Sequence, residues 1–161
     1  MTVWSALAGG FAGTIALTTT LAGASHLGLT RADLPFLLGT AFTLDRPRAR
    51  MIGFAVHIVA GLVFSLGYYA MFIAIGVSSW WLGALFGLGH ALFAGTWLVN
   101  TLLPLVHPSM GTTMTAANEA PLVEPPGFML LNYGPATPVV TIVGHMLYGA
   151  IIGAFVAAGA R

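Results

Sequence analysis

Long apolar runs separated by shorter, more polar stretches dominate the chain. Four runs are each long enough to cross a bilayer, which takes about 20 mostly apolar residues. They lie near residues 3–27, 51–77, 79–105 and 137–160. The runs are continuous and do not alternate between apolar and polar positions, so they predict helices rather than barrel strands. The pattern therefore predicts an all-α, integral membrane four-helix bundle, with residues 1–161 as a single transmembrane domain.

Two long connections, residues 28–50 and 106–136, separate these runs, whereas residues 77–79 form only a tight turn. With four spans, both long connections face the same side of the membrane. That side has four arginines before the second span, and the other side has only Arg161; the four are Arg31, Arg46, Arg48 and Arg50. Because cytoplasmic loops carry an excess of Arg and Lys, we expect both long loops in the cytoplasm. Both termini are then expected outside a bacterial inner membrane.

Both long connections contain apolar segments, at residues 34–38, 121–123 and 128–131. Loops of this length are usually functional or disordered, and these are too apolar for disorder. Two arrangements would bury the apolar segments. The loops either fold back over the mouth of the bundle or dip into it, or they form short helices that lie flat on the lipid.

Charge and cysteine content narrow the classes of function. Only 6% of the residues are charged and 58% are hydrophobic, whereas roughly 25% of residues are charged in a soluble domain. So few charges cannot cover a water-facing surface, and the chain has no lysine to contact phosphates. A soluble domain, a disordered chain and a nucleic-acid binder are therefore excluded. The absence of cysteine excludes disulfides, thiolate metal sites and cysteine nucleophiles.

Several residues recur in the same order in the two halves of the chain. The tetrapeptide Phe-Ala-Gly-Thr occurs at residues 11–14 and 93–96, in the first and third runs. Each half then contains a histidine, an acidic residue two positions before a proline, and a His-x-x-x-Gly pattern: His26, Asp33 and His57 in the first half, and His107, Glu124 and His145 in the second. This order predicts two tandem helix–loop–helix repeats, related by a pseudo-twofold axis along the membrane normal.

Gly61 and Gly149 belong to stripes of small residues spaced by four, and each stripe contains one histidine, His57 or His145. Residues four apart share one face of a helix, and such stripes let helix backbones approach closely in lipid. Tight helix packing is the simplest interpretation. Glycine beside a ligand would also leave room for a flat cofactor.

A titratable side chain inside a span usually faces the bundle interior or a cavity. His57 and His145 lie at similar depth in the half of the membrane near the long loops, and Asn100 lies at a similar depth. His90 lies deeper and has no histidine at its repeat position. The candidate metal ligands are His26, Asp33, His57, His107, Glu124 and His145, and the candidate cofactor contacts are Gly61, Asn100 and Gly149.

Four interpretations of these residues stay open. Imidazole and carboxylate groups suit a transition metal such as zinc, manganese or iron. Alternatively, His57 and His145 ligate a haem from its two sides, or the cluster relays protons or ions. In the fourth, each histidine bonds a backbone carbonyl or a Thr hydroxyl and only specifies packing. No motif assigns a reaction, because the chain lacks His-Glu-x-x-His, Gly-x-Ser-x-Gly and a phosphate loop.

The second half carries a distinctive series of short motifs. They are His107-Pro108, Glu124-Pro125-Pro126-Gly127, Asn132-Tyr133-Gly134 and His145-x-x-Tyr148-Gly149. The series resembles that of an uncharacterised family of small bacterial four-span membrane proteins. In that family the position after His-Pro tends to be basic, whereas this chain has Ser109. The resemblance implies the four-span topology and transfers no catalytic residue.

Three functions fit these features. In the first, the protein binds a metal or cofactor between its two halves and acts as an accessory or redox subunit of a larger membrane complex. In the second, it is a purely structural subunit that packs against partner membrane proteins. In the third, it is a small oligomeric transporter or channel. The expected partners are the lipid bilayer and either other membrane subunits or further copies of the chain.

Overall fold

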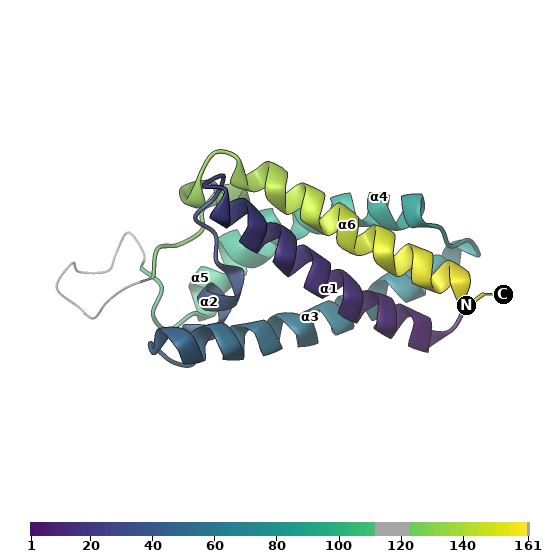
Figure 1. The fold of residues 1–161 in the computed structure, drawn as a ribbon, viewed down its shortest axis with the longest axis horizontal. Coiled ribbons are helices and arrows are strands. Elements are labelled where there is room, and N and C mark those ends of the chain that lie inside the picture. The colour runs from purple at the N-terminus through teal and green to yellow at the C-terminus, as the bar shows by residue number, and fades with distance from the viewer. Residues whose placement is uncertain (112–122, 161) are drawn as a thin grey trace.

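The structure is a computed structural model, and it describes residues 1–111 and 123–160. Within these residues the fold is all-helical, with one isolated β-bridge and no β-strand. Four helical segments are long and apolar enough to cross a membrane, which confirms the four predicted runs; they are Val3–His26, Arg46–Ile75, Trp80–Val106 and Thr137–Ala158. Figure 1 shows the bundle with both termini at one end and the two long connections at the other.

The second long helix, α3 (Arg46–Ile75), begins before the apolar run that predicted it. The carboxylate of Asp45 accepts a hydrogen bond from the backbone N–H of Arg48 at 3.0 Å, and Pro47 occupies the first turn. Both features favour the start of a helix. The helix ends where Gly76 adopts a left-handed φ of 76°, a common helix stop. The arginines of residues 46–50 therefore lie on the helix rather than in a loop.

The third span is not a uniform α-helix. It consists of α4 (Trp80–Phe93), a π-helical segment η1 (Ala94–Leu102) and the short α5 (Leu103–Val106). Pro104, in the first turn of α5, has no N–H to donate to the helical ladder. Apolar periodicity gives no sign of this wider winding, because the segment remains helical and apolar throughout. π-Helical turns often occur at functional sites.

Small residues bring α6 (Thr137–Ala158) against both α1 (Val3–His26) and α4. A Cβ atom added to Gly87 would collide with the backbone carbonyl of His145, and one added to Gly13 would lie 2.8 Å from the Tyr148 ring. The bundle core between the helices consists of Ala6, Leu17, Leu21, Tyr68, Phe72, Tyr148, Ile152 and Val156. These contacts fix the rotation of α6, the helix that carries His145.

Interfaces that a twofold axis would make equivalent are built differently. Glycines such as Gly9 let the backbones of α1 and α6 approach closely. Larger rings fill the equivalent space between α3 and α4, where the centroids of Phe72 and Phe86 lie 5.2 Å apart. The tandem repeat therefore stays a prediction based on the order of residues.

The described parts of both long connections fold back onto the end of the bundle. The first forms α2 (Leu34–Gly39), which lies on the first turns of α3, since a Cβ on Gly53 would collide with the Pro35 carbonyl. The second forms a 3-10 segment, η2 (Phe128–Tyr133), against η1. The two connections share a second apolar core made of Ala32, Leu37, Met110, Leu130 and Tyr133. Leu37, Met129 and Leu130 of the apolar loop segments are buried, whereas Phe128 and Leu131 are exposed. Residues 121 and 122 of the predicted segment 121–123 lie outside the described residues.

Candidate functional site

Three histidines from three different helices meet inside the bundle. His57 on α3 and His145 on α6 are only 8% and 7% exposed, and His90 on α4 is half-buried. The ring centroids of His90 and His145 lie 4.8 Å apart. Gly61 lies one helical turn after His57, and Tyr148 lies about one turn after His145. The Tyr148 hydroxyl donates a hydrogen bond to the Gly61 carbonyl at 2.5 Å. This bond places His57 and His145 at the same depth.

Hydrogen bonds determine which nitrogen of each buried imidazole carries the proton. The Thr18 hydroxyl donates to the Thr14 carbonyl at 2.8 Å, so its oxygen can only accept the bond to His57 Nδ1 at 3.0 Å. His145 Nδ1 lies 2.8 Å from the Thr141 carbonyl, which is an acceptor only. Both histidines therefore carry their proton on Nδ1, and their Nε2 atoms have free lone pairs. No described residue forms a hydrogen bond with either Nε2 atom.

Two further polar groups lie beside these rings. The Tyr68 hydroxyl is 3.4 Å from His90 Nδ1, and the Phe64 ring covers His90 with centroids 4.2 Å apart. One turn before His145, the buried Thr141 hydroxyl has no hydrogen-bond partner among the described residues. Thr inside a helix usually bonds the carbonyl four residues earlier, so a free hydroxyl at this position is unusual.

His90 is the histidine that the predicted repeat leaves without an equivalent, and the structure brings it into the cluster. In the predicted repeat, the position equivalent to His90 in the first half is Ala8, so His90 has no matching histidine. A different signal was present: His90 follows Gly83 by seven residues and Gly87 by three, spacings that share one helix face. Because Gly83 and Gly87 face α6, His90 is turned toward His145.

The other predicted ligands lie outside this cluster. His26 is exposed at the end of α1. Asp33 and Glu124 form ion pairs at the loop end of the molecule, with Arg50 at 2.8 Å and with Arg31 at 3.3 Å respectively. With the side chains in their present positions, no three His, Asp or Glu groups within residues 1–111 and 123–160 could hold a metal ion, and this includes His57, His90 and His145. The predicted single site is therefore divided between the bundle and the loops.

His107 is buried at the loop end, where both of its ring nitrogens lie within hydrogen-bond distance of neighbouring groups. It is 5% exposed, and its Nδ1 accepts a hydrogen bond from the backbone N–H of Ser109 at 3.2 Å. Its Nε2 therefore carries the proton and lies 3.1 Å from the Thr40 hydroxyl and 3.2 Å from the Leu37 carbonyl. These bonds fasten the second connection to α2 and leave the ring no free lone pair for a metal.

The predicted cofactor contacts are also placed. Asn100 is half-buried on η1. A Cβ atom on Gly61 would collide with the Thr14 hydroxyl, and one on Gly149 would collide with the Gly83 carbonyl. Neighbouring helices thus fill the space beside both glycines, and a flat ring such as haem does not fit there.

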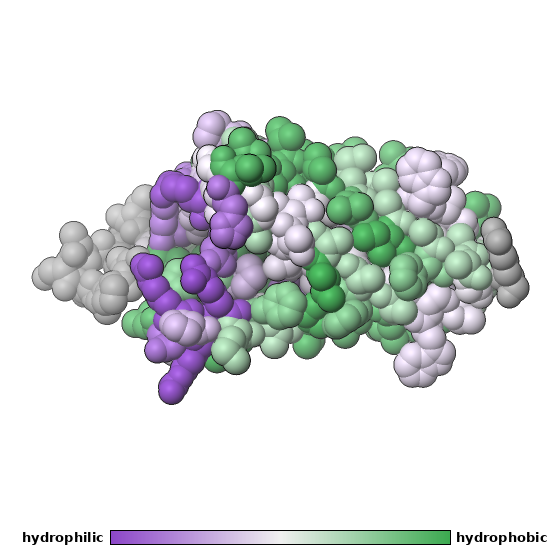
Figure 2. Space-filling model, viewed as in Figure 1, coloured by the Kyte–Doolittle hydropathy of each residue, from purple (hydrophilic) through white to green (hydrophobic). Residues whose placement is uncertain are grey.

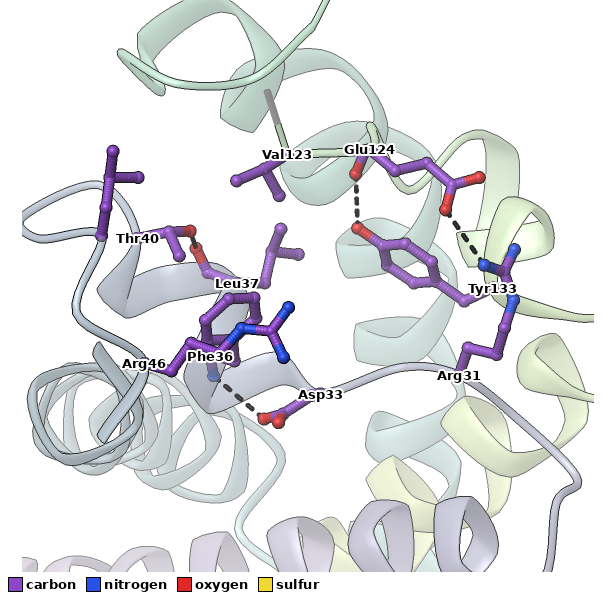
Figure 3. A pocket seen from close by; sticks show the side chains of 10 residues that line it. Arg31, Asp33, Phe36, Leu37, Thr40, Arg46, Val123, Glu124 and Tyr133 are labelled. Carbon is purple, nitrogen blue, oxygen red and sulfur yellow. Dashed lines mark hydrogen bonds and ion pairs between the residues drawn. The ribbon is translucent and has the colours of Figure 1, made fainter. Parts of the chain in front are cut away.

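A pocket of about 350 Å³ opens at the loop end, between α2, the start of α3 and the second connection. Hydrophilic residues gather at this end of the surface, as Figure 2 shows. The pocket is lined by Arg31, Asp33, Phe36, Leu37, Thr40, Leu44, Arg46, Val123, Glu124 and Tyr133. Figure 3 shows the ion pair of Arg31 with Glu124 on one side and the side chain of Arg46 beside the Phe36 ring on the other. We call it the loop-face pocket.

Tyr133 holds one wall of the loop-face pocket. Burial raises the pKa of its phenol, and the negative charge of Glu124 raises it further, while Arg31 lowers it. The phenol therefore stays protonated and donates a hydrogen bond to the backbone carbonyl of Glu124 at 2.7 Å. This bond ties η2 to the segment that carries Glu124.

Comparison with known proteins adds no family. No protein-family model matches the chain, and neither a curated protein nor a solved structure matches it. The resemblance to the four-span bacterial family therefore stays a prediction.

Proposed function

We propose that this chain is a multi-pass membrane protein that binds a transition-metal ion inside its helix bundle. The ligands are the Nε2 atoms of His57 and His145, with His90 as the third imidazole. The observation that carries the proposal is the free Nε2 lone pair on both His57 and His145, whose Nδ1–H groups are fixed by Thr18 and by the Thr141 carbonyl. Metal-binding histidines typically have this arrangement, in which the second ring nitrogen donates to a fixed acceptor.

The ligand set favours particular metals. Three imidazoles without a carboxylate suit zinc, copper or nickel better than magnesium or calcium, which prefer oxygen ligands. The rings of His90 and His145 now stand edge to face, at 79°. Binding therefore requires the His90 ring to turn about its side-chain bonds. The unpartnered Thr141 hydroxyl supplies a hydrogen-bond group for a water on the ion.

The bound ion would serve a membrane complex in which this chain is an accessory or redox subunit. Large apolar side chains on the outer faces of the helices support contacts with lipid or partner helices. Examples are Val59 and Val63 on α3, both 61% exposed, and Val139 on α6, which is 62% exposed. If the histidines only specify packing, the same faces suit a purely structural subunit.

Metal analysis of the purified protein separates these two functions. We expect one equivalent of copper or zinc per chain after metal loading and dialysis, and loss of that equivalent in His57→Ala and in His145→Ala. His26→Ala is the matched control, because it removes an exposed imidazole outside the cluster. Since metal-binding histidines must be neutral, occupancy should fall on acidification. Absence of stoichiometric metal from the unaltered chain, or equal loss in His26→Ala, would contradict the proposal.

We also propose that the loops face the cytoplasm of a bacterial cell and that the termini lie outside its inner membrane. The support is the concentration of arginine at the loop end. The chain has no cysteine, so single substitutions Ser78→Cys and Ser109→Cys report each side cleanly. Only Ser78→Cys should react with an impermeant maleimide added to spheroplasts. Labelling of both from outside contradicts this topology.

The tandem duplication belongs to the same proposal and rests on the repeated order of residues. Its test is an experimentally determined structure in a membrane mimetic. The pair α1 and α3 should overlay on α4 and α6 in sequence order after a twofold rotation about the membrane normal. Failure of that overlay would leave the repeated order as a coincidence of composition.

A further inference from the structure

The loop-face pocket combines an apolar wall with an arginine, Arg46, that forms no ion pair within the described part of the chain. Both of its carboxylates are already engaged by groups of the protein. Asp33 accepts hydrogen bonds from the Phe36 backbone N–H at 3.0 Å and from Arg50 Nε at 2.8 Å, and Glu124 pairs with Arg31. Two positive and two negative side chains line the pocket, so it has no formal excess of either charge. The four charged side chains differ in whether they already pair with another described residue.

Arg46 is the side chain that remains available. Its guanidinium carbon lies 5.7 Å from the centroid of the Phe36 ring, an arrangement that holds an arginine over an aromatic face. No carboxylate among the described residues lies within ion-pair distance of Arg46. Figure 3 shows the side chain beside the Phe36 ring at the pocket, so its N–H donors are available to a ligand there.

The remainder of the wall is apolar. Phe36, Leu37, Leu44 and Val123 line the pocket together with the ring of Tyr133. Leu37 belongs to the buried loop core, whereas Leu44 is 53% exposed at the rim. A volume of about 350 Å³ lies within the range of small-molecule sites, which are mostly apolar with a few placed polar groups. The pocket lies at the start of α3, whose next turns expose apolar side chains such as Met51 and Phe54. Amphiphiles concentrate beside such apolar surfaces in a membrane.

We propose that the loop-face pocket binds an anionic amphiphile. Its phosphate or carboxylate head group bonds to Arg46, and its apolar body packs against Phe36, Leu44 and Val123. Planar guanidinium groups bind phosphate and carboxylate with two parallel hydrogen bonds, which suits an arginine that pairs with no carboxylate among the described residues. The same chemistry is offered by an anionic lipid of the surrounding bilayer and by a soluble alkyl phosphate.

The test measures binding of defined probes to the metal-free protein, so it is independent of the proposed metal site. Decyl phosphate, below its micelle-forming concentration, probes the soluble source, with decanol as the uncharged comparison. Retention of phosphatidylglycerol over phosphatidylcholine in native mass spectrometry probes the lipid source. Arg46→Gln should weaken binding of the anionic probe about tenfold, the effect of losing a hydrogen bond to a charged group. Arg48→Gln, which removes the same charge from the same helix outside the pocket, should change it less than about twofold.

A second pair of variants keeps the test independent of Arg46. Leu44→Glu places a carboxylate at the exposed rim of the pocket, and Phe42→Glu places one at a 66% exposed position that does not line it. Only Leu44→Glu should abolish binding. If Arg46→Gln and Leu44→Glu lose binding of phosphatidylglycerol only, the ligand is a lipid. If they lose binding of decyl phosphate only, the ligand is a soluble amphiphile. Equal losses in Arg46→Gln and Arg48→Gln, equal binding of decanol, or no binding of any probe would overturn the proposal.

Discussion

Polar side chains have different kinds of partner in the interior of the bundle and at its loop end. In the interior, regular α-helices pack through glycine, and the buried histidines bond a backbone carbonyl or a hydroxyl with one nitrogen only. At the loop end, charged side chains form ion pairs, as Asp33 does with Arg50. Lipid offers no partner to a polar atom, whereas the interface supplies water and head groups. An Nε2 atom without a described hydrogen-bond partner is therefore more unusual in the interior than an unpaired polar group is at the loop end.

Backbone conformation differs between the two regions as well. Within the described residues, Met129 and Leu130 are the only non-glycine residues with positive φ, at 51° and 61°. Each such residue costs roughly 1–2 kcal/mol. Both side chains are 5% exposed, and Gly95 on η1 leaves the space into which Met129 packs. Burial of these side chains in the loop region offsets the strain.

The largest effect should come from removing a close helix contact in the interior. Gly87→Ala forces a Cβ atom into the His145 carbonyl, so α4 and α6 must separate, at a cost of about 3 kcal/mol. Gly89→Ala is the control on the same helix, because a Cβ there meets nothing within 4 Å. It should be neutral or stabilise by up to about 1 kcal/mol. Thermal unfolding in detergent measures both, and equal melting temperatures would contradict the close packing described for α4 and α6.

The two histidines paired by the predicted repeat should behave unequally. His107→Ala removes the buried ring that joins the second connection to α2 and leaves the Ser109 N–H without its acceptor, which costs about 2 kcal/mol. His26→Ala removes an exposed ring and should cost less than about 0.5 kcal/mol. Protease cleavage within the loops measures the release of the second connection. Similar cleavage rates in both variants would show that His107 does not fasten the loops.

A smaller effect is expected at Asp33, which both caps α2 and pairs with Arg50. Asp33→Ala loses both the ion pair and the bond to the Phe36 N–H, and the lost capping bond alone should destabilise the loop end by about 1 kcal/mol. Asp33→Asn keeps a capping oxygen and loses only an exposed ion pair, worth about 0.2–1 kcal/mol. Hydrogen exchange of the α2 amides separates the two. Equal protection in both variants would show that capping contributes nothing.

The smallest effect concerns pH and Tyr133. Burial raises the pKa of this phenol in the folded state. The stability that the neutral phenol gives the folded loop end is therefore complete below the ordinary tyrosine pKa of about 10. It is lost as the pH rises above that value. The loop end should therefore loosen in alkali, and Tyr133→Phe should loosen less steeply because it has no phenolic proton to lose. Amide exchange of residues 123–133 between pH 9 and pH 11 tests this, and identical slopes would contradict it.

The four apolar helices follow from the amino-acid sequence alone, because the length and continuity of an apolar run are local properties. The sequence singled out His57 and His145, since an imidazole within an apolar run is anomalous wherever the helices pack. The sequence also placed both long connections at one end of the bundle, because the chain runs away from that end along α3 and returns to it along the span that begins with α4 (Figure 1).

Which polar residues meet depends on how the helices and loops pack together. His90 joins His145 because the contacts of Gly83 and Gly87 fix the rotation of α4 against α6. Asp33 and Glu124 leave the histidine set because arginines at the loop end pair with them. Rotation and pairing depend on side chains from segments distant in sequence. A pattern read along one chain carries no information on which of those segments will face each other.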